Sequence, residues 1–457
     1  MAQDVTVPGS PLFILTRLLT KLNQRQPDLK VLSDYYDGKH RLAFSSQKFR
    51  NAFGGMFSAF ADNFCPLIVE AVEERLNIEG FRYGSDPTAD KDAWRIWQTA
   101  QMDALSQIGH NSSLKLGDSY AIVWGDDDGQ PRISVESARQ VIVAYAPGDR
   151  TKRVAALKSW IDEDGKHATL FLPDFVYTYK SSESTMAAWV PDAEAGDVWP
   201  MPNPLGVVPV VPLTNRPDLD VEFGVSEFLV AIPLQDAINK LSADLLVASE
   251  YIAFPQRYVT GLEIPVDDNG NPVQPFEISL DKLLIAEDPG AKFGTLTAGD
   301  LQNYVTALTR FTGDVATLTR TPPHYFGIGG QFPSGDALKA AETALVAKSR
   351  RKMRFYGEAW EEVMALAFKV LGDPRGDVVD AETIWGDPEY RSEAELADAL
   401  VKRAAIGVPR QQLWEDAGYT QTQISRFHAM EVADSLDKLL AAPAIPTVPA
   451  VKVTAEA

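Results

Sequence analysis

The sequence is poor in the residues and runs that mark secreted, membrane and metal-binding proteins. Its 457 residues include one cysteine, Cys65, so no disulfide can form within the chain, which is typical of assembly in a reducing compartment. The five histidines never form a ligand pair such as HExxH, so we expect no metal site. The apolar runs are shorter than the roughly 18 residues of a membrane span, and the first residues lack the pattern of a signal peptide.

Nucleotide-binding and nucleophile motifs are also missing. No GxxxxGK[ST] loop occurs, and Gly327–Phe332 has phenylalanine where GxGxxG requires its last glycine. Gly224–Phe228 lacks the closing glycine of a nucleophile elbow. Asp126–Gly129 resembles part of a calcium loop, but Gln130 and Pro131 break the register, so a plain turn is the better interpretation. We therefore expect no catalytic residue, cofactor or metal.

Basic residues are fewer than acidic ones. Lysine and arginine number 43 against 63 acidic residues, which gives a net charge of −20. Such a surface repels DNA, RNA and anionic lipid, so non-specific nucleic-acid binding by the whole surface is excluded, whereas local basic patches are not. Hydrophobic residues make up 45%, which is sufficient for a large core, and the length indicates about three domains.

The first half of the chain mixes helical and strand patterns. Apolar residues repeat at helical spacing in three segments: Leu12–Leu22, Phe64–Leu76 and about Asp92–Leu116, the last with Ile108 on its apolar side. Asp128-Gly129 and Asp164-Gly165 each lie between alternating apolar residues and predict β-hairpins. Residues 181–217, rich in proline, glycine and acids, predict a loop with short strands.

The second half is mainly helical. Residues 225–254 have a helical pattern, in which Pro233 either kinks or restarts the helix. Its heptad-like apolar seam consists of Leu234, Ile238, Leu241, Leu245 and Ile252. A β-rich insert, 255–298, with a hairpin turn at Asn269-Gly270, precedes a second helix, 299–321, capped by Asp300. A loop at 322–335 then leads into a long helix, 336–372, of about 55 Å.

The C-terminal part is predicted to be helical over 373–442. Ser392-x-x-Glu395 and Thr420-x-x-Gln423 match the capping-box pattern, Pro409 suits a first helical turn, and the tail 443–457 is predicted to be disordered. A helix pair with an insert between its members and apolar residues on several sides favours oligomerisation. An ordinary helix pair inside one large domain is the alternative on this layout alone.

Several stretches, taken together in order, resemble portal proteins of tailed bacteriophages, in particular those of siphophages of actinobacteria. They run from about Leu32 to Tyr419: YYDGKHRL (Tyr35–Leu42), VEAVEERLNIEGF (Val69–Phe81), the segment Phe223–Gly261, TRTPPHYFG (Thr319–Gly327) with PSGDALKAAETALVAKSRRK (Pro333–Lys352), and the segment Ser392–Tyr419. Residues 181–217 and the tail have no such resemblance.

The resemblance implies an α+β, mainly helical portal fold. Its parts would be an α/β wing of helices and hairpins at 1–224, a two-helix stem at 225–254 and 299–321, a small β-rich clip at 255–298, a tunnel loop at 322–335, a long channel helix at 336–372, and a helical C-terminal wing and crown at 373–442.

A portal protein of this kind is a structural virion protein at the unique capsid vertex, and no enzyme. The resemblance implies a ring of about twelve copies that conducts DNA during packaging and ejection. The implied partners are double-stranded DNA without sequence specificity, the terminase large subunit, major capsid and scaffold proteins, and a head–tail adaptor, with no membrane contact and assembly in the host cytoplasm. The alternatives are an acidic cytosolic hydrolase, whose barrel would need eight strand–helix repeats that we do not find, and another head-completion or tail protein.

Two sets of residues are candidates for contacts in such a channel. The first belongs to the tunnel loop and the helix after it: His324, Tyr325, Phe326, Gln331, Phe332 and Lys339. Lys339 is the candidate for a phosphate contact, whereas the aromatic residues either press against DNA or pack between subunits. Glycines 327, 329 and 330 between prolines 322, 323 and 333 predict a flap on firm hinges.

The second set is a basic cluster of five residues within seven positions: Lys348, Arg350, Arg351, Lys352 and Arg354. These residues spread around a helix and cannot all face DNA. We therefore expect them to pair with acidic residues of neighbouring subunits.

Overall fold

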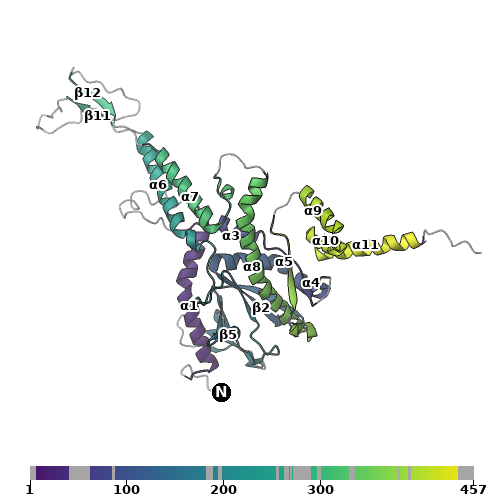
Figure 1. The fold of residues 1–457 in the computed structure, drawn as a ribbon. Coiled ribbons are helices and arrows are strands. Elements are labelled where there is room, and N and C mark those ends of the chain that lie inside the picture. The colour runs from purple at the N-terminus through teal and green to yellow at the C-terminus, as the bar shows by residue number, and fades with distance from the viewer. Residues whose placement is uncertain are drawn as a thin grey trace, which may run out of the picture. The chain divides into compact units, whose positions relative to one another are not determined.

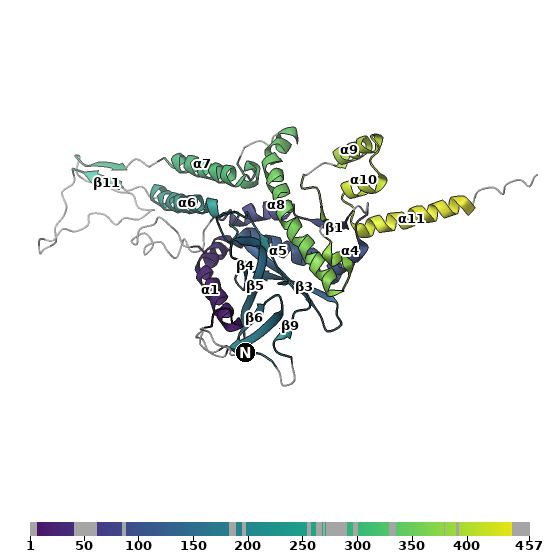
Figure 2. The same cartoon turned by 60° about the horizontal axis from the view of Figure 1, so that its bottom comes forward.

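The computed structural model describes residues 7–40, 62–84, 88–181, 189–193, 198–253, 257–261, 267, 270, 290–295, 300–328, 335–378, 380–389 and 393–440. The chain divides into two compact units, whose elements are drawn in Figures 1 and 2. Unit 1 consists of Met1–Ser33, Pro66–Leu229 and Pro333–Ala457, and unit 2 of Asp34–Cys65 and Val230–Phe332.

Unit 1 is built around a six-stranded antiparallel sheet. Its order is β4-β5-β6-β7-β8, with β9 also paired to β7. The strands are β4 (Val141–Ala146), β5 (Asp149–Asp162), β6 (Gly165–Phe171), β7 (Phe175–Ser181), β8 (Val190–Pro191) and β9 (Met201–Pro202). The hairpin expected at Asp164-Gly165 is confirmed, because Asp162 pairs with Gly165 and Gly165 has a positive φ of 127° that suits glycine.

Helix α1 (Pro11–Tyr36) covers one face of this sheet (Figure 1). The repeat of leucines predicted this helix correctly, and all five of them are buried against the sheet: Leu12, Leu15, Leu18, Leu19 and Leu22. They pack on strand residues such as Leu157, Leu170 and Tyr179. The opposite side of α1 is polar, so burial of one apolar stripe fixes the helix to the sheet.

A three-stranded sheet packs on the other face of the six-stranded sheet. Its order is β10-β2-β3, formed by β2 (Asp118–Gly125), β3 (Pro131–Ser137) and β10 (Val210–Thr214). Tyr120, Ile122 and Val210 share a core with Val143 and Phe171 of the larger sheet. The hairpin at Asp128-Gly129 is confirmed, with φ 72° at Gly129. Residues 181–217 therefore contribute a core strand, β10, besides short strands.

The helices of the first half are α3 (Cys65–Glu73), α4 (Lys91–Thr99) and α5 (Met102–Leu116). The predicted single segment 92–116 is thus two helices, separated at Gln101, whose backbone is left-handed with φ 56°. Ile108 lies outside the core, with 59% of its surface exposed. Cys65 is buried as expected, and burial raises the pKa of its thiol to about 12.

The long helix is confirmed as α8 (Gly335–Val370), which lies against β2, β3, β10 and β13. Its Trp360 is fully buried and its indole N–H donates to Nε2 of buried His110, at 2.9 Å. Tyr356 stacks on the same imidazole. Burial lowers the pKa of His110 to about 3, so this histidine is neutral and serves the core of unit 1.

The C-terminal region contains a strand as well as helices, contrary to the helical prediction for 373–442. After a short 3₁₀ turn, η3 (Pro374–Asp377), strand β13 (Ala381–Trp385) pairs antiparallel with β1 (Ile78–Tyr83). Three helices follow, α9 (Glu393–Ala405), α10 (Arg410–Asp416) and α11 (Gln421–Leu440). The capping box of Thr420 and Gln423 is confirmed by both reciprocal bonds, whereas Pro409 is the N-cap of α10 and not in its first turn. Ser392 lies outside the described residues.

Unit 2 contains a pair of helices that lie side by side, α6 (Ile232–Ala253) and α7 (Gln302–Thr319) (Figures 1 and 2). A short 3₁₀ turn, η1 (Leu229–Ala231), precedes α6, so Pro233 restarts the helix and α6 begins later than the predicted residue 225. The carboxylate of Asp300 accepts a hydrogen bond from Gln302 N at 2.8 Å, although Leu301 occupies the cap position.

The insert between these helices is described only in part. Strands β11 (Arg257–Thr260) and β12 (Lys292–Thr295) pair antiparallel. Gly270 has φ 79°, and its N–H donates to the carbonyl of Asp267 in a turn. Asn269 and most of the predicted hairpin lie outside the described residues, as does the tail 443–457.

The segment Asp34–Cys65 groups with α6 in unit 2, although we expected a wing that spans 1–224. Polar contacts explain this grouping. The Tyr35 hydroxyl donates to the Asp236 carboxylate at 2.9 Å, and Oε1 of Gln235 accepts from Phe64 N at 2.9 Å. None of the described helices is long and apolar enough to span a membrane.

The packing of α1 generates a stability prediction. Leu15 is fully buried between α1 and the sheet, so Leu15→Ala should destabilise unit 1 by about 2–5 kcal/mol through lost burial and a cavity. Arg17→Ala, on the exposed side of the same helix, should change stability by only about 0.5 kcal/mol. Urea denaturation measures both, and equal midpoints for the two variants would contradict the assignment of these faces.

Candidate channel segment and basic cluster

The connection after α7 begins as an ordered turn. Arg320 adopts a left-handed backbone with φ 54°, and buried Thr321 and Pro322 follow it. Residues Pro323–Phe326 then form a 3₁₀ turn, η2, closed by Gly327 with φ 69°. The N–H of Tyr325 donates to the carbonyl of Pro322 at 3.1 Å. The first half of the predicted tunnel loop therefore has regular structure.

The candidate loop residues have different surroundings. Phe326 packs edge-on against Phe64 with ring centroids 5.3 Å apart, so it has a partner within unit 2. The rings of His324 and Tyr325 lie 4.8 Å apart, and both residues are half-buried. Gln331 and Phe332 lie outside the described residues. A contact of this loop with DNA therefore stays a prediction.

Two lysines of the basic cluster point into unit 1. Lys348 and Lys352 lie one turn apart on the inner side of α8, and both approach the carboxylate of Glu227, at 3.3 Å and 2.6 Å. All three side chains are at least nine-tenths buried. Asn215 completes the cluster, because its amide donates to Glu227 at 3.2 Å and its Oδ1 accepts from Lys352. The expected inter-subunit pairing is wrong for Lys348 and Lys352. Both lie on the inner side of the helix, where they pair with Glu227 of the same chain.

The charges in this cluster depend on one another. Burial alone would raise the pKa of Glu227, but Lys352 and Lys348 lower it to about 2, below its ordinary 4.5. This pairing therefore stabilises the fold above the ordinary pKa and is lost as the pH falls from 4.5 towards about 2. Burial lowers the pKa of Lys352 to about 8, although Glu227 opposes that shift.

A close crossing of two backbone segments positions Glu227. Gly117, with φ 93°, and Gly224 approach so closely that a Cβ on Gly224 would lie 2.0 Å from the carbonyl oxygen of Gly117. The side chain of Asp118 accepts from Gly224 N at 3.1 Å and pairs with Arg25 of α1 at 2.8 Å. None of these residues was predicted from the sequence. A single acid within the apolar run VSEFLV is the signal that could have identified Glu227.

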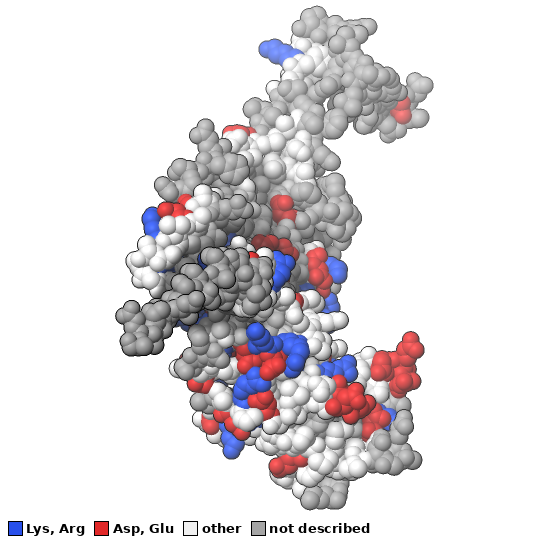
Figure 3. Space-filling view, turned by 90° about the vertical axis from the view of Figure 1, so that its right-hand side faces the viewer, with Lys and Arg blue, Asp and Glu red and all other residues white. Residues whose placement is uncertain are grey.

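The remaining arginines of the cluster face outward. Arg350 is half-exposed and lies 3.7 Å from Asp387 and 3.6 Å from Glu389. Arg351 stacks over Phe355 at 5.6 Å, and Arg354 is exposed, with no ion pair to any described residue. Basic and acidic side chains are interleaved on the face shown in Figure 3. These three arginines thus remain candidates for contacts with another molecule.

Lys339, the candidate phosphate contact, forms an ion pair with Glu395 of α9 in unit 1. Both side chains are partly exposed, so the pair is accessible to competing ions. The seam residues of α6 differ in burial: Ile238 is buried, whereas Leu234, Leu241, Leu245 and Ile252 are partly exposed in the single chain.

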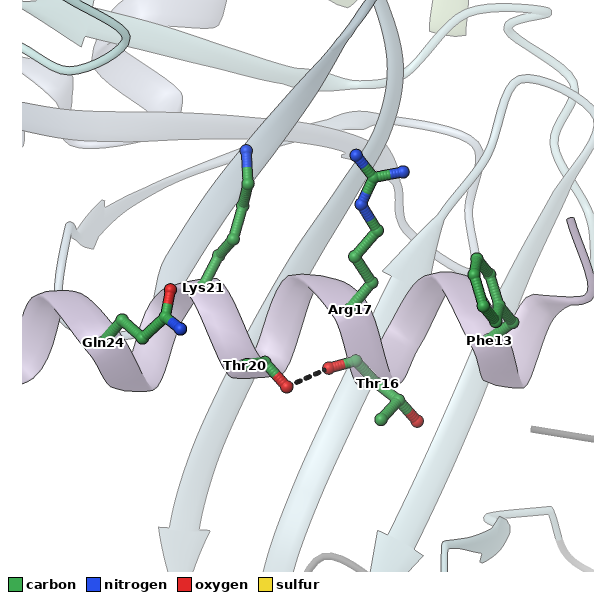
Figure 4. A pocket seen from close by; sticks show the side chains of 6 residues that line it. All are labelled: Phe13, Thr16, Arg17, Thr20, Lys21 and Gln24. Atoms are coloured by element: carbon green, nitrogen blue, oxygen red, sulfur yellow. Dashed lines mark hydrogen bonds between the residues drawn. The ribbon is translucent and has the colours of Figure 1, made fainter. Parts of the chain in front are cut away.

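An open groove of about 440 Å³ follows the outer side of α1 (Figure 4). The described residues that line it are Phe13, Thr16, Arg17, Thr20, Lys21 and Gln24. They offer no carboxylate and no histidine, and Lys21 is paired with Glu222 at 2.8 Å. Across the described parts of the chain, no group of three or more His, Cys, Asp or Glu side chains is arranged to hold a metal ion.

The buried cluster generates a second stability prediction. Glu227→Gln leaves Lys348 and Lys352 buried without their carboxylate and should destabilise unit 1 by about 3–5 kcal/mol. Arg350→Met removes only a half-exposed pair and should cost less than about 1 kcal/mol. Adding Lys352→Met to Glu227→Gln should recover part of the loss, as denaturant titration will show. A Glu227→Gln protein as stable as the Arg350→Met protein would refute the buried pairing.

Comparison with known proteins identifies the family. Residues 15–431 match the family described as "Phage portal protein, SPP1 Gp6-like". A "Portal protein" of Mycobacterium phage D29 is 32% identical over 410 residues, which cover 84% of this chain and 82% of that protein. A "Portal protein" of Mycobacterium phage L5 is 29% identical over 465 residues, which cover 96% of this chain and 93% of that protein.

Solved structures include distant neighbours. A chain from the "Neck of empty GTA particle computed with C6 symmetry" has a TM-score of 0.46 at 14% identity and covers 81% of this chain and 92% of its own. A chain from the "Neck of native GTA particle computed with C12 symmetry" has a TM-score of 0.45 at 13% identity, with coverages of 82% and 94%.

The family match covers most of the chain and includes both the helices of unit 2 and the long helix α8. It confirms the resemblance seen in the sequence, and it removes the acidic hydrolase as an alternative, because portal proteins are structural and not enzymatic. The chain therefore belongs to the phage portal protein family, SPP1 Gp6-like, and is a structural portal protein of a tailed bacteriophage.

Proposed function

We propose that about twelve copies of this chain form a closed ring that conducts double-stranded DNA into and out of the capsid at its unique vertex. The observation that carries the proposal is the family match over residues 15–431. Ring assembly takes place in the host cytoplasm with capsid and scaffold proteins. The ring then remains in the virion at the neck.

The incompletely covered helices of unit 2 support assembly. In the single chain Val305 and Leu318 of α7 are 44% and 53% exposed, and four residues of the α6 seam are only partly buried. Apolar residues at heptad-like spacing on a helix pair bury this surface when a second helix packs on it. A neighbouring copy of unit 2 supplies such helices in a ring.

We assign the portal parts to the residues predicted from the sequence. Residues 1–224 form the wing except for Asp34–Cys65, which groups with the helices of unit 2. Residues 225–254 and 299–321 form the stem, 255–298 the clip, 322–335 the tunnel loop, 336–372 the channel helix, and 373–442 the C-terminal wing and crown. The pairing of β11 with β12 beyond α6 and α7 supports a distinct clip. The clip binds the terminase large subunit during packaging and the head–tail adaptor afterwards.

The net charge supports a passive conduit. At −20 per chain, most surfaces repel the phosphates of DNA, so passing DNA meets few attractive sites. The outward arginines of α8 and Lys339, which forms an ion pair with Glu395, are local basic exceptions on this acidic surface. The energy for translocation comes from the separate terminase motor, since a structural portal has no nucleotide chemistry of its own.

Ring assembly is testable at the seam. Leu241→Glu places a charge on the seam and should abolish rings in negative-stain electron micrographs, because burying an unpaired carboxylate is unfavourable. Leu246→Glu, on the same helix but off the seam, should leave rings intact. Circular dichroism of both variants verifies that α6 and α7 still fold. Rings formed equally by both proteins would argue against the seam as the subunit contact.

The tunnel loop is testable in phage assembly. Replacement of Gly327–Phe332 by a shorter Ser/Gly linker should leave ring formation intact, because the seam is unchanged, and should reduce the number of DNA-filled heads. The ordered turn Pro323–Phe326 is retained in this variant, so its contact with Phe64 serves as an internal control. Normal numbers of filled heads would refute a DNA contact of the loop, and loss of rings would show that the loop is a packing element.

A further inference from the structure

Glu79 occupies an irregular position at the edge of unit 1. It lies in strand β1 between Ile78 and Gly80, where the register with β13 shifts by a β-bulge. A bulge re-aims the side chain that it carries. Here the carboxyl of Glu79 lies over Gly386, whose added Cβ would be 2.9 Å from Oε1. The half-buried carboxyl forms no hydrogen bond or ion pair with any described residue.

The charged groups that act on the pKa of Glu79 have the same sign as its carboxylate. Burial, followed by the carboxylates of Glu415 and Asp387, raises the pKa of Glu79 to about 7. Glu415 belongs to helix α10, and Asp387 follows strand β13. The side chain of Glu79 thus prefers to be neutral where these elements meet.

The same place is where the C-terminal helices contact the β1–β13 sheet. Glu415 is buried and pairs with Arg82 of β1 at 2.7 Å, while its Oε1 has no hydrogen-bond partner. Gln421, the first residue of α11, is 8% exposed, packs against Gly80 and has an unpartnered amide nitrogen. Buried polar groups left unsatisfied make this contact weaker than an apolar one.

Other charges around the contact are already engaged. Arg82 also reaches Glu382 at 3.3 Å, and Arg403 of α9 pairs with Asp416. From α8, Arg350 lies 3.7 Å from Asp387.

On α11, His428 lies 3.9 Å from Glu431. Histidine ordinarily changes charge near neutral pH, so His428 needs its own control.

We propose that Glu79 is a proton-dependent latch, whose neutral carboxyl lets α10 and α11 rest on the β1–β13 sheet and whose ionisation loosens them. The sign follows from the geometry. A third carboxylate beside Glu415 and Asp387 repels both, and it repels less once α10 moves away into water. The contact is therefore tightest below about pH 5 and weakens as the pH rises towards neutrality. This inference does not depend on ring assembly.

Hydrogen exchange of the full-length chain measures the latch. Protection factors, which correct for the chemical pH dependence of exchange, should fall on the order of tenfold in α10 and α11 between about pH 5.5 and 8.5, since one pKa unit corresponds to a tenfold change. Peptides from α5 should keep their protection. Glu79→Gln, which mimics the neutral side chain, should keep α10 and α11 protected at both pH values.

Three further variants complete the test. Glu74→Gln, an exposed glutamate shortly before β1, and His428→Gln should both behave as the wild type. Asp387→Asn removes one carboxylate that repels ionised Glu79, so the transition in protection should move to lower pH. A move to higher pH would contradict this repulsion. The latch is overturned if wild-type protection is independent of pH, if Glu79→Gln loses protection like the wild type, if His428→Gln abolishes the effect, or if α5 loosens in parallel.

Discussion

The architecture of unit 1 depends on one crowded crossing of the backbone. Gly117 and Gly224 meet there at a separation that excludes any side chain at either position. The crossing brings Asn215 and Glu227 under the long helix α8, where Lys348 and Lys352 neutralise the acid. It also brings Asp118 to Arg25 of α1. Helices α1 and α8, which are far apart in the sequence, are thereby tied to the same part of unit 1 by largely buried charges.

This buried arrangement explains why a chain with net charge −20 retains a dense group of basic residues. A charge buried inside a protein needs an opposite charge beside it, either from the same chain or from a neighbouring subunit. Two members of the group pair with a buried acid, whereas the three arginines on the outer side of α8 are exposed, and Arg350 forms only long contacts with Asp387 and Glu389. The internal lysines pair with Glu227 inside unit 1, whereas the outer arginines lie on the opposite, exposed side of the same helical segment.

The elements that the sequence predicted are those determined by neighbours along the chain. The leucine repeat of α1, the two Asp-Gly hairpins and the extent of α8 all follow from local periodicity or turn chemistry. The break at Gln101 was missed because an αL residue between two helices has no distinctive sequence signal unless it is glycine. Strand β13 was missed because its partner is distant in sequence.

The same limit applies to the candidate site. Spacing identified Lys348 and Lys352 as neighbours on a helix, but only the fold shows that both pair with Glu227. The family resemblance named the loop His324–Phe332 and its aromatics, and the structure adds a partner for Phe326 that no local pattern contains. Residues whose role depends on tertiary neighbours are thus the ones that sequence reasoning leaves undetermined.

The pairing of β1 with β13 has a consequence for synthesis on the ribosome. Arg82 and Glu382 face each other across a separation of 300 residues. Until the partner strand emerges, the edge of β1 exposes unpaired backbone groups to any other nascent chain. A subunit interrupted before residue 381 lacks β13 and the helices α9–α11, so it cannot close this sheet. The β1–β13 sheet can therefore form only after the chain has been synthesised past Trp385, and until then the edge of β1 stays unpaired.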